Sequence, residues 1–131
     1  MANFFERPIS LAHALMRHAA SRGDEPALRF LDGHSEDGLV LSYRQLDARA
    51  QTIAAVLAQR FKPGDRALLL LTSGPDYVAS FFACLYAGVI SVPAYPPEST
   101  RSQHLERLLS IISDAEPSVI LTTSQLLPAL T

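Results

Sequence analysis

A continuous apolar run, Ala67 to Leu71, limits the possible folds of this chain more than any other feature. No polar residue interrupts the run, so both faces of the strand that it predicts should be buried. Strands of parallel sheets, which helices cover on both faces, have this pattern, whereas half-exposed antiparallel strands alternate apolar and polar residues. The run therefore predicts an α/β protein with a parallel sheet.

The segments that follow alternate between helix and strand. A helix is expected over Tyr77 to Ala87, with Gly88 as its stop, and Val89 to Val92 predicts the next strand. Ser73 and Gly74 can cap this helix, Pro75 suits its first turn, and Asp76 suits its positive end. A further helix, which Thr100 can cap, precedes a third strand, Val119 to Leu121; its predicted apolar face consists of Leu105, Leu108, Leu109, Ile112 and Ala115.

The first half predicts a helix, a hairpin and a second helix. The first helix runs from Leu11 to Arg22, with Ser10 as its N-cap and Gly23 as its stop. Two short apolar runs, Ala27 to Leu31 and Leu39 to Tyr43, flank a polar loop and predict the hairpin. Ser42 and Gln45 match a capping box, and the helix that follows buries one stripe, made of Leu46, Ala50, Ile53, Leu57 and Phe61.

The predicted fold class is thus α/β, a partial doubly wound sheet in which a hairpin and a helix precede a strand-helix-strand-helix-strand unit. Parallel strands need right-handed crossovers, which the intervening helices supply. Residues 1–23 form a leading helix in this division, and residues 24–131 form an incomplete part of a larger domain. The helix from Tyr77 to Ala87 supports incompleteness, because it is apolar nearly all round and 131 residues are too few to cover it.

Composition excludes several classes of protein. A chain of 131 residues with 48% hydrophobic and 18% charged residues is globular, and its net charge of −2 argues against binding nucleic acid or an anionic membrane. The single cysteine, Cys84, cannot form an internal disulfide and suits the cytoplasm. Gly88 and Pro93 interrupt the uncharged segment from Tyr77 to Pro97, so no membrane span is predicted.

Catalytic and binding motifs are absent. The glycines form neither a dinucleotide-binding nor a Walker motif, and the only lysine, Lys62, lies at a helix end. The four histidines, His13, His18, His34 and His104, have no metal-ligand spacing and are expected on the surface. Cys84 is expected to be buried and inert, with a raised pKa.

Two turns nevertheless lie where open α/β sheets bind ligands. The turn from Thr72 to Asp76 and the loop from Pro93 to Pro97 each follow the carboxyl end of a predicted parallel strand. Either segment can instead be purely structural, with Ser73 as a helix cap and Pro93 to Pro97 as a stiff connector.

Two segments resemble motifs of the adenylate-forming, AMP-binding enzyme superfamily. Leu41-Ser-Tyr-Arg-Gln-Leu46 resembles the first core motif of that superfamily, with Gln45 in place of the usual glutamate, and Leu85-Tyr-Ala-Gly-Val-Ile-Ser-Val-Pro93 resembles the second. The continuation Pro93-Ala-Tyr-Pro-Pro97 looks like that of fatty acyl-AMP ligases. The chain therefore resembles the N-terminal fragment of such a ligase.

The resemblance implies a reaction for the full-length enzyme. Such an enzyme activates a fatty acid with ATP and Mg²⁺ to an acyl-adenylate, which it transfers to an acyl carrier protein in lipid, polyketide or lipopeptide synthesis. The functional elements of the family lie beyond these residues, so no catalytic, cofactor-binding or metal residue is assigned here, and substrate-binding residues stay open. The fragment is expected to be an inactive scaffold whose partner is the remainder of the ligase.

Two alternatives remain on the sequence alone. The chain can be a free-standing α/β module that binds a ligand with the loops at the carboxyl ends of its strands. It can also be a protein-interaction domain that docks through its apolar helix.

Overall fold

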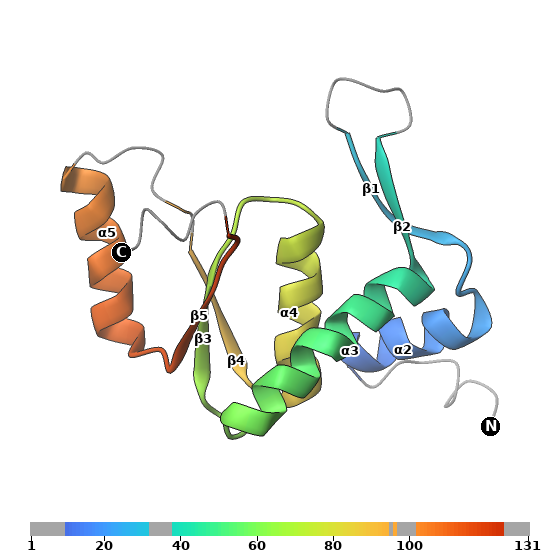
Figure 1. Ribbon diagram of the computed structural model, residues 1–131, viewed down its shortest axis with the longest axis horizontal. Helices are drawn as coiled ribbons and strands as arrows, with labels where there is room; N and C mark the ends of the chain where they lie inside the picture. The colour runs from blue at the N-terminus through green and yellow to red at the C-terminus, as the bar shows by residue number, and fades with distance from the viewer. Residues whose placement is uncertain (1–9, 32–37, 95, 97–101, 125–131) are drawn as a thin grey trace.

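The structure, a computed structural model, describes residues 10–31, 38–94, 96 and 102–124. Its elements follow the order α2, β1, β2, α3, β3, α4, β4, α5, β5. Figure 1 shows two groups of strands, an antiparallel hairpin and a parallel three-stranded sheet. The predicted hairpin, helix and strand-helix-strand-helix-strand unit are confirmed.

The first helix ends differently from the prediction. Helix α2 (Leu11–Ser21) begins at Ser10, whose hydroxyl accepts a hydrogen bond from the His13 backbone N–H at 3.1 Å, and its C-cap is Arg22. Gly23 does not have the positive φ of a left-handed stop. A glycine suits this position because a Cβ here would lie 2.6 Å from the Ala19 carbonyl oxygen and 2.6 Å from Nη2 of Arg44.

The hairpin leads directly into the second helix. Strand β1 (Pro26–Phe30) pairs antiparallel with β2 (Leu39–Ser42), and Ser42 is the N-cap of α3 (Tyr43–Arg60). The capping box is confirmed, because the Gln45 N–H donates to Oγ of Ser42 at 3.1 Å and Oε1 of Gln45 accepts from the Ser42 N–H at 2.9 Å. Most of the predicted stripe lies inward, with Ala54 as an addition to it and with Ile53 and Phe61 partly buried.

The parallel sheet has β3 (Arg66–Leu70) at its centre, between β4 (Ile90–Ala94) and β5 (Val119–Leu121). Strand β3 begins and ends one residue before the predicted run, and β4 runs two residues into the segment predicted as a loop from Pro93. Pro93 is tolerated because β4 is an edge strand of the described sheet. The Ile90 N–H donates to the carbonyl of Asp65, which directly precedes β3. Because successive backbone nitrogens along a strand point to opposite sides, the nitrogen at position 93 points away from β3.

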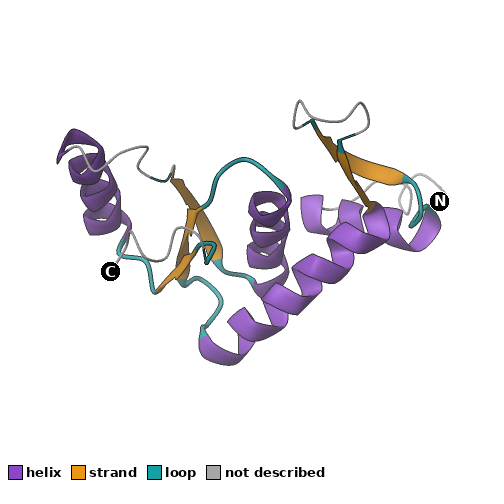
Figure 2. Cartoon of the chain, turned by 45° about the horizontal axis from the view of Figure 1, so that its top comes forward, coloured by secondary structure: helices purple, strands orange, loops and turns teal. Residues whose placement is uncertain are grey.

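Helices cover both faces of this sheet, as the apolar run predicts. Figures 1 and 2 show α4 (Pro75–Ala87) on one face and α5 (Ser102–Ala115) on the other. Ala67 and Leu69 of β3 pack with α3 and α4, whereas Leu68 and Leu70 pack with Leu108 of α5.

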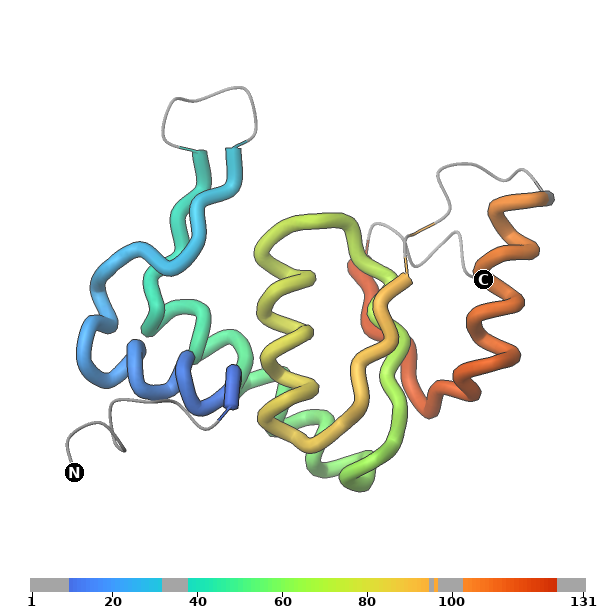
Figure 3. Tube along the Cα trace, turned by 180° about the vertical axis from the view of Figure 1, so that it is seen from behind, coloured from blue at the N-terminus to red at the C-terminus, as the bar shows by residue number. Residues whose placement is uncertain are grey.

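Helix α4 is covered in part by the two helices that precede it. Figure 3 shows α3 and α2 lying beside it, and four of its residues are buried: Ala79, Ser80, Ala83 and Cys84. The Tyr86 hydroxyl donates to Oδ1 of Asp47 on α3 at 2.7 Å. Phe81 and Phe82 are only partly buried and Leu85 is 39% exposed, so the described chain leaves part of the apolar surface of α4 uncovered.

Helix α5 is covered only in part. Leu108 is buried and Ile112 packs beside it, but Leu109, a member of the same predicted face, is 62% exposed. Ile111 packs inward instead, so the apolar surface of α5 is wider than the contact it makes. Thr100, its expected cap, lies outside the described residues.

Candidate pocket at the carboxyl ends of the parallel strands

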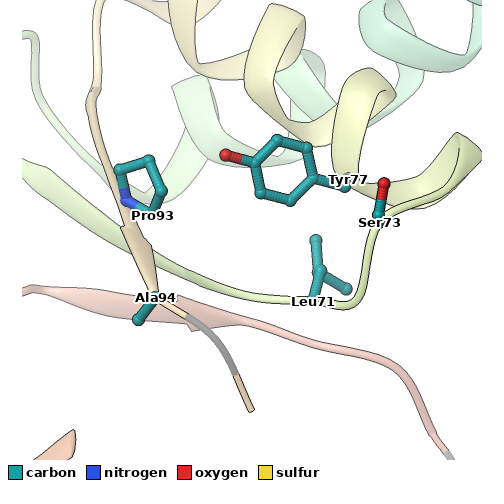
Figure 4. Close-up of a pocket in the computed structure, with 5 residues that line it drawn as sticks. All are labelled: Leu71, Ser73, Tyr77, Pro93 and Ala94. Atoms are coloured by element: carbon teal, nitrogen blue, oxygen red, sulfur yellow. The ribbon is translucent and has the colours of Figure 1, made fainter. Parts of the chain in front are cut away.

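The carboxyl ends of β3 and β4 border a pocket of about 250 Å³. Strand β3 leads to α4 on one face of the sheet, and β4 precedes α5 on the opposite face (Figure 1). Neighbouring strands whose connections diverge in this way leave a crevice in open α/β sheets, where ligands bind. The pocket lining consists of Leu71, Ser73, Tyr77, Pro93 and Ala94 (Figure 4).

Each lining residue is placed by the end of an element. Leu71 directly follows β3, and Pro93 and Ala94 are the last two residues of β4. Tyr77 lies in the first turn of α4, and Figure 4 shows its ring extending from the helix toward Pro93. Because Leu71 is 3% exposed and Ala94 is 8% exposed, they form the buried floor of the pocket.

The structure brings together parts of the two segments that the sequence singles out. Ser73 comes from the turn at 72–76, and Pro93 and Ala94 come from the predicted loop at 93–97, of which residues 95 and 97 lie outside the described residues. Sequence reasoning missed Tyr77. No local pattern indicated it, because its place in the lining depends on how the first turn of α4 lies against β4.

Ser73 is not the cap of α4. The N-cap is Gly74, and no side chain caps this helix. The residue before a proline is restricted to extended conformations, and Gly74, which precedes Pro75, is extended as an N-cap must be. Ser73 lies one residue earlier, and its side chain lines the pocket instead.

The lining is apolar apart from two hydroxyl groups, those of Ser73 and Tyr77. None of the five described lining side chains carries a charge at neutral pH, so these residues offer no cation to a phosphate group. Within the ranges that the structure describes, no three side chains of His, Cys, Asp or Glu are grouped so that they could hold a metal ion. The residues present therefore do not fit the phosphates of ATP or their Mg²⁺.

Cys84 is fully buried, as predicted, and burial raises the pKa of its thiol to about 11. Burial, followed by the hydrogen bond to Asp47 and the charge of that carboxylate, also raises the pKa of Tyr86. Lys62 is exposed after the end of α3, away from the pocket lining.

The three described histidines, His13, His18 and His104, are not part of the pocket lining. His18 on α2 is not a bare surface residue, because its ring centroid lies 5.0 Å from that of Tyr43. His13 and His104 are partly buried, and His34 lies outside the described residues. Of the described helices, none is both long and apolar enough to cross a membrane.

This fold places the chain in the class of open parallel α/β proteins, which have a crevice at the carboxyl ends of their strands. Comparison with known families gives a match between residues 15–131 and the AMP-binding enzyme family. The chain belongs to this family.

Its relatives are ligases that act on fatty acids. The chain is 40% identical over 119 residues to the long-chain-fatty-acid–AMP ligase FadD32 of Mycolicibacterium smegmatis, a match that covers 88% of this chain and 19% of that protein. It is 43% identical over 97 residues to the medium-chain-fatty-acid–[acyl-carrier-protein] ligase JamA of Moorena producens, covering 73% of this chain and 16% of JamA.

A solved structure has the same fold. The fatty acyl-adenylate ligase of L. pneumophila, in complex with acyl adenylate and pyrophosphate, matches with a TM-score of 0.88 and 32% identity. That match covers 98% of this chain and 22% of the other. The chain thus spans about a fifth of the length of the relatives it matches.

Proposed function

We propose that this chain is the scaffold portion of a fatty acyl-AMP ligase. The observation that carries the proposal is the similarity of nearly the whole chain to a fatty acyl-adenylate ligase, in fold and in sequence. In this proposal residues 1–23 provide a leading helix, residues 24–131 form the incomplete N-terminal part of the AMP-binding domain, and the enzyme works in the cytoplasm.

The complete ligase activates a fatty acid with ATP, forming an acyl-adenylate and releasing pyrophosphate. The acyl group then passes to a carrier protein, a partner supported by the name of the relative JamA. Mg²⁺ belongs to this reaction, and no described residue of the chain is assigned to hold it. The role of the chain is to supply the first strands of the sheet and the helices that cover them.

This chain alone is proposed to lack ligase activity. The uncharged lining of its pocket supports this, because transfer at phosphorus relies on charged groups that stabilise the transferring phosphate. We expect no ATP–pyrophosphate exchange with saturated fatty acids of 6 to 18 carbons. A complete fatty acyl-AMP ligase under identical conditions is the positive control, and exchange above the protein-free blank would contradict the proposal.

The gene tests the larger proposal. Sequencing beyond the codon for Thr131 should find a continuing reading frame that encodes a Ser/Thr/Gly-rich loop followed by lysine. A stop codon at that place would refute the scaffold role. The pocket would then favour the second candidate function, a free-standing ligand-binding module.

A further inference from the structure

The pocket between β3 and β4 is distinguished by what its lining lacks. Its five described lining residues include neither an acidic nor a basic side chain, and three of them, Leu71, Pro93 and Ala94, are wholly apolar. The charged residue nearest in sequence to the lining, Asp76, is acidic. An anion entering the pocket would lose water without gaining an opposite charge.

Two hydroxyl groups are the polar features of the lining. Figure 4 shows the Ser73 hydroxyl at the turn and the Tyr77 hydroxyl reaching toward β4. Among the residues that the structure describes, neither hydroxyl has a hydrogen-bond partner. A hydroxyl can donate one hydrogen bond and accept others, so both groups are available to an uncharged oxygen.

The volume sets the size of the occupant. About 250 Å³ is below the range of pockets that enclose a whole drug-sized molecule. The buried floor of Leu71 and Ala94 suits a short apolar body, with its oxygen toward the Tyr77 hydroxyl on the β4 side (Figure 4).

We propose that this pocket is a binding site for a neutral amphiphile, a short alkyl or aromatic group that carries one uncharged oxygen. The described lining gives phosphate and carboxylate groups no opposite charge, so we expect such anions to bind less well than the neutral amphiphile. This proposal is independent of the proposed function, because it concerns a binding preference of the described residues and requires no adenylation.

The test uses a cysteine placed in the pocket. Cys84 is fully buried, so in Ser73→Cys the new thiol is the accessible one. A thiolate attacks a methanethiosulfonate, forms a mixed disulfide and releases methanesulfinate. The rates of neutral propyl methanethiosulfonate and of the anionic 2-sulfonatoethyl reagent are compared at position 73, and at position 113 in the matched control Ser113→Cys, which lies exposed on α5.

The expected result is a preference for the neutral reagent about tenfold larger at position 73 than at position 113. Hexan-1-ol should slow the labelling of position 73, whereas hexanoate at the same concentration should not. Ser73→Cys leaves Tyr77 as the hydroxyl of the described lining, so Tyr77→Phe in that background should weaken the protection by hexan-1-ol.

Equal preferences at the two positions, or protection by hexanoate equal to that by hexan-1-ol, would overturn the proposal. Rapid labelling of Cys84 in the unchanged chain would also overturn it, because the packing that shapes the pocket would then be absent. None of these results bears on ATP–pyrophosphate exchange or on the reading frame beyond Thr131, so the two proposals can fail separately.

Discussion

Gly23 joins three elements at one point. The Arg44 N–H at the start of α3 donates to the Gly23 carbonyl at 3.0 Å, and the Arg44 guanidinium forms an ion pair with Asp24. The guanidinium crosses the space that a side chain at position 23 would need. The absence of a Cβ therefore lets α2, the strand entry and α3 approach one another.

Gly23→Ala should destabilise the chain by about 1–3 kcal/mol, because the added methyl would meet a backbone oxygen at 2.6 Å. Urea unfolding followed by circular dichroism measures the change. Gly74→Ala is the matched control, since no atom lies within 4 Å of a Cβ there and its backbone is extended. Equal midpoints for the two variants would contradict this account of Gly23.

Because of Cys84, the free energy of unfolding should depend on pH in the alkaline range. Its pKa is raised from 9.0 to about 11 in the folded chain, so between these values the unfolded chain has lost a proton that the folded chain keeps. The contribution of the protonated Cys84 thiol to the free energy of unfolding is therefore fully present below pH 9, and it is lost as the pH rises toward 11. Unfolding free energies at pH 8, 9, 10 and 11 should fall less steeply in Cys84→Ala than in the native chain. Parallel curves would refute this effect.

At the scale of elements, α3 and α4 have the most extensive mutual contact in the described chain, and one side-chain hydrogen bond, from Tyr86 to Asp47, joins them. Tyr86→Phe removes its donor and leaves the Asp47 carboxylate without that partner. We expect a loss of about 1 kcal/mol, at the modest end for a bond to a charged group because both residues are only partly buried.

A double-mutant cycle with Asp47→Ala isolates the pair. If the hydrogen bond accounts for the loss, Tyr86→Phe should cost less in the Asp47→Ala background than in the native chain. Additive losses would show that Tyr86 contributes through packing alone.

The end of α5 is held in a strained conformation. Glu116 has a φ of 48°, which a residue with a Cβ adopts at a cost, and the Arg66 guanidinium donates to the Ala115 carbonyl beside it. Glu116→Gly should raise the free energy of unfolding by about 0.5–1 kcal/mol. Glu106→Gly, in the body of the same helix, should lower it by about 1 kcal/mol. A lower thermal midpoint for Glu116→Gly would contradict the prediction.

Element types were predictable from the sequence because capping and periodicity are local. The Ser42–Gln45 capping box and the left-handed Gly88 both lie where the sequence places them. Strand ends were less predictable, because hydrogen bonds between strands decide them. Pro93 extends β4 only because its nitrogen faces away from β3, and no local pattern contains that fact.

The position of the pocket in the fold was predictable from the sequence, but the set of residues that line it was not. Carboxyl ends of parallel strands indicate where a crevice forms, and Ser73 and Pro93 do meet there. The participation of Tyr77 depends on how α4 lies against β4, which follows from tertiary packing. Which residues of α4 are buried also depends on tertiary packing, because the angle at which α3 crosses α4 is set by contacts between the two helices.

At the scale of the whole molecule, several large apolar side chains remain exposed. Leu109 on α5 is 62% exposed, Ile120 on β5 is 42% exposed, and Leu31 after the hairpin strand is 74% exposed. Exposed apolar area of this kind is stabilised when another polypeptide removes it from water. The positions of these residues on α5, on β5 and at the hairpin are compatible with the proposed scaffold role.

The isolated chain should therefore bind a hydrophobic dye and self-associate as its concentration rises. Leu109→Glu should reduce both effects and change the unfolding free energy by no more than about 0.5 kcal/mol. Leu108→Ala, at the buried neighbour, should cost about 2–4 kcal/mol. Dye fluorescence and sedimentation velocity are the measurements, and a monomer without dye binding would contradict the prediction.

Pro93 gives the two sides of the described sheet different capacities for growth. A strand added outside β4 would find no N–H at position 93 and would lose one bond of the ladder, whereas the outer side of β5 carries no proline. A strand beside β5 would meet no such loss. A single imino acid at the rim of the pocket thus makes the two outer edges of the described sheet unequal and protects the β4 edge against unwanted pairing.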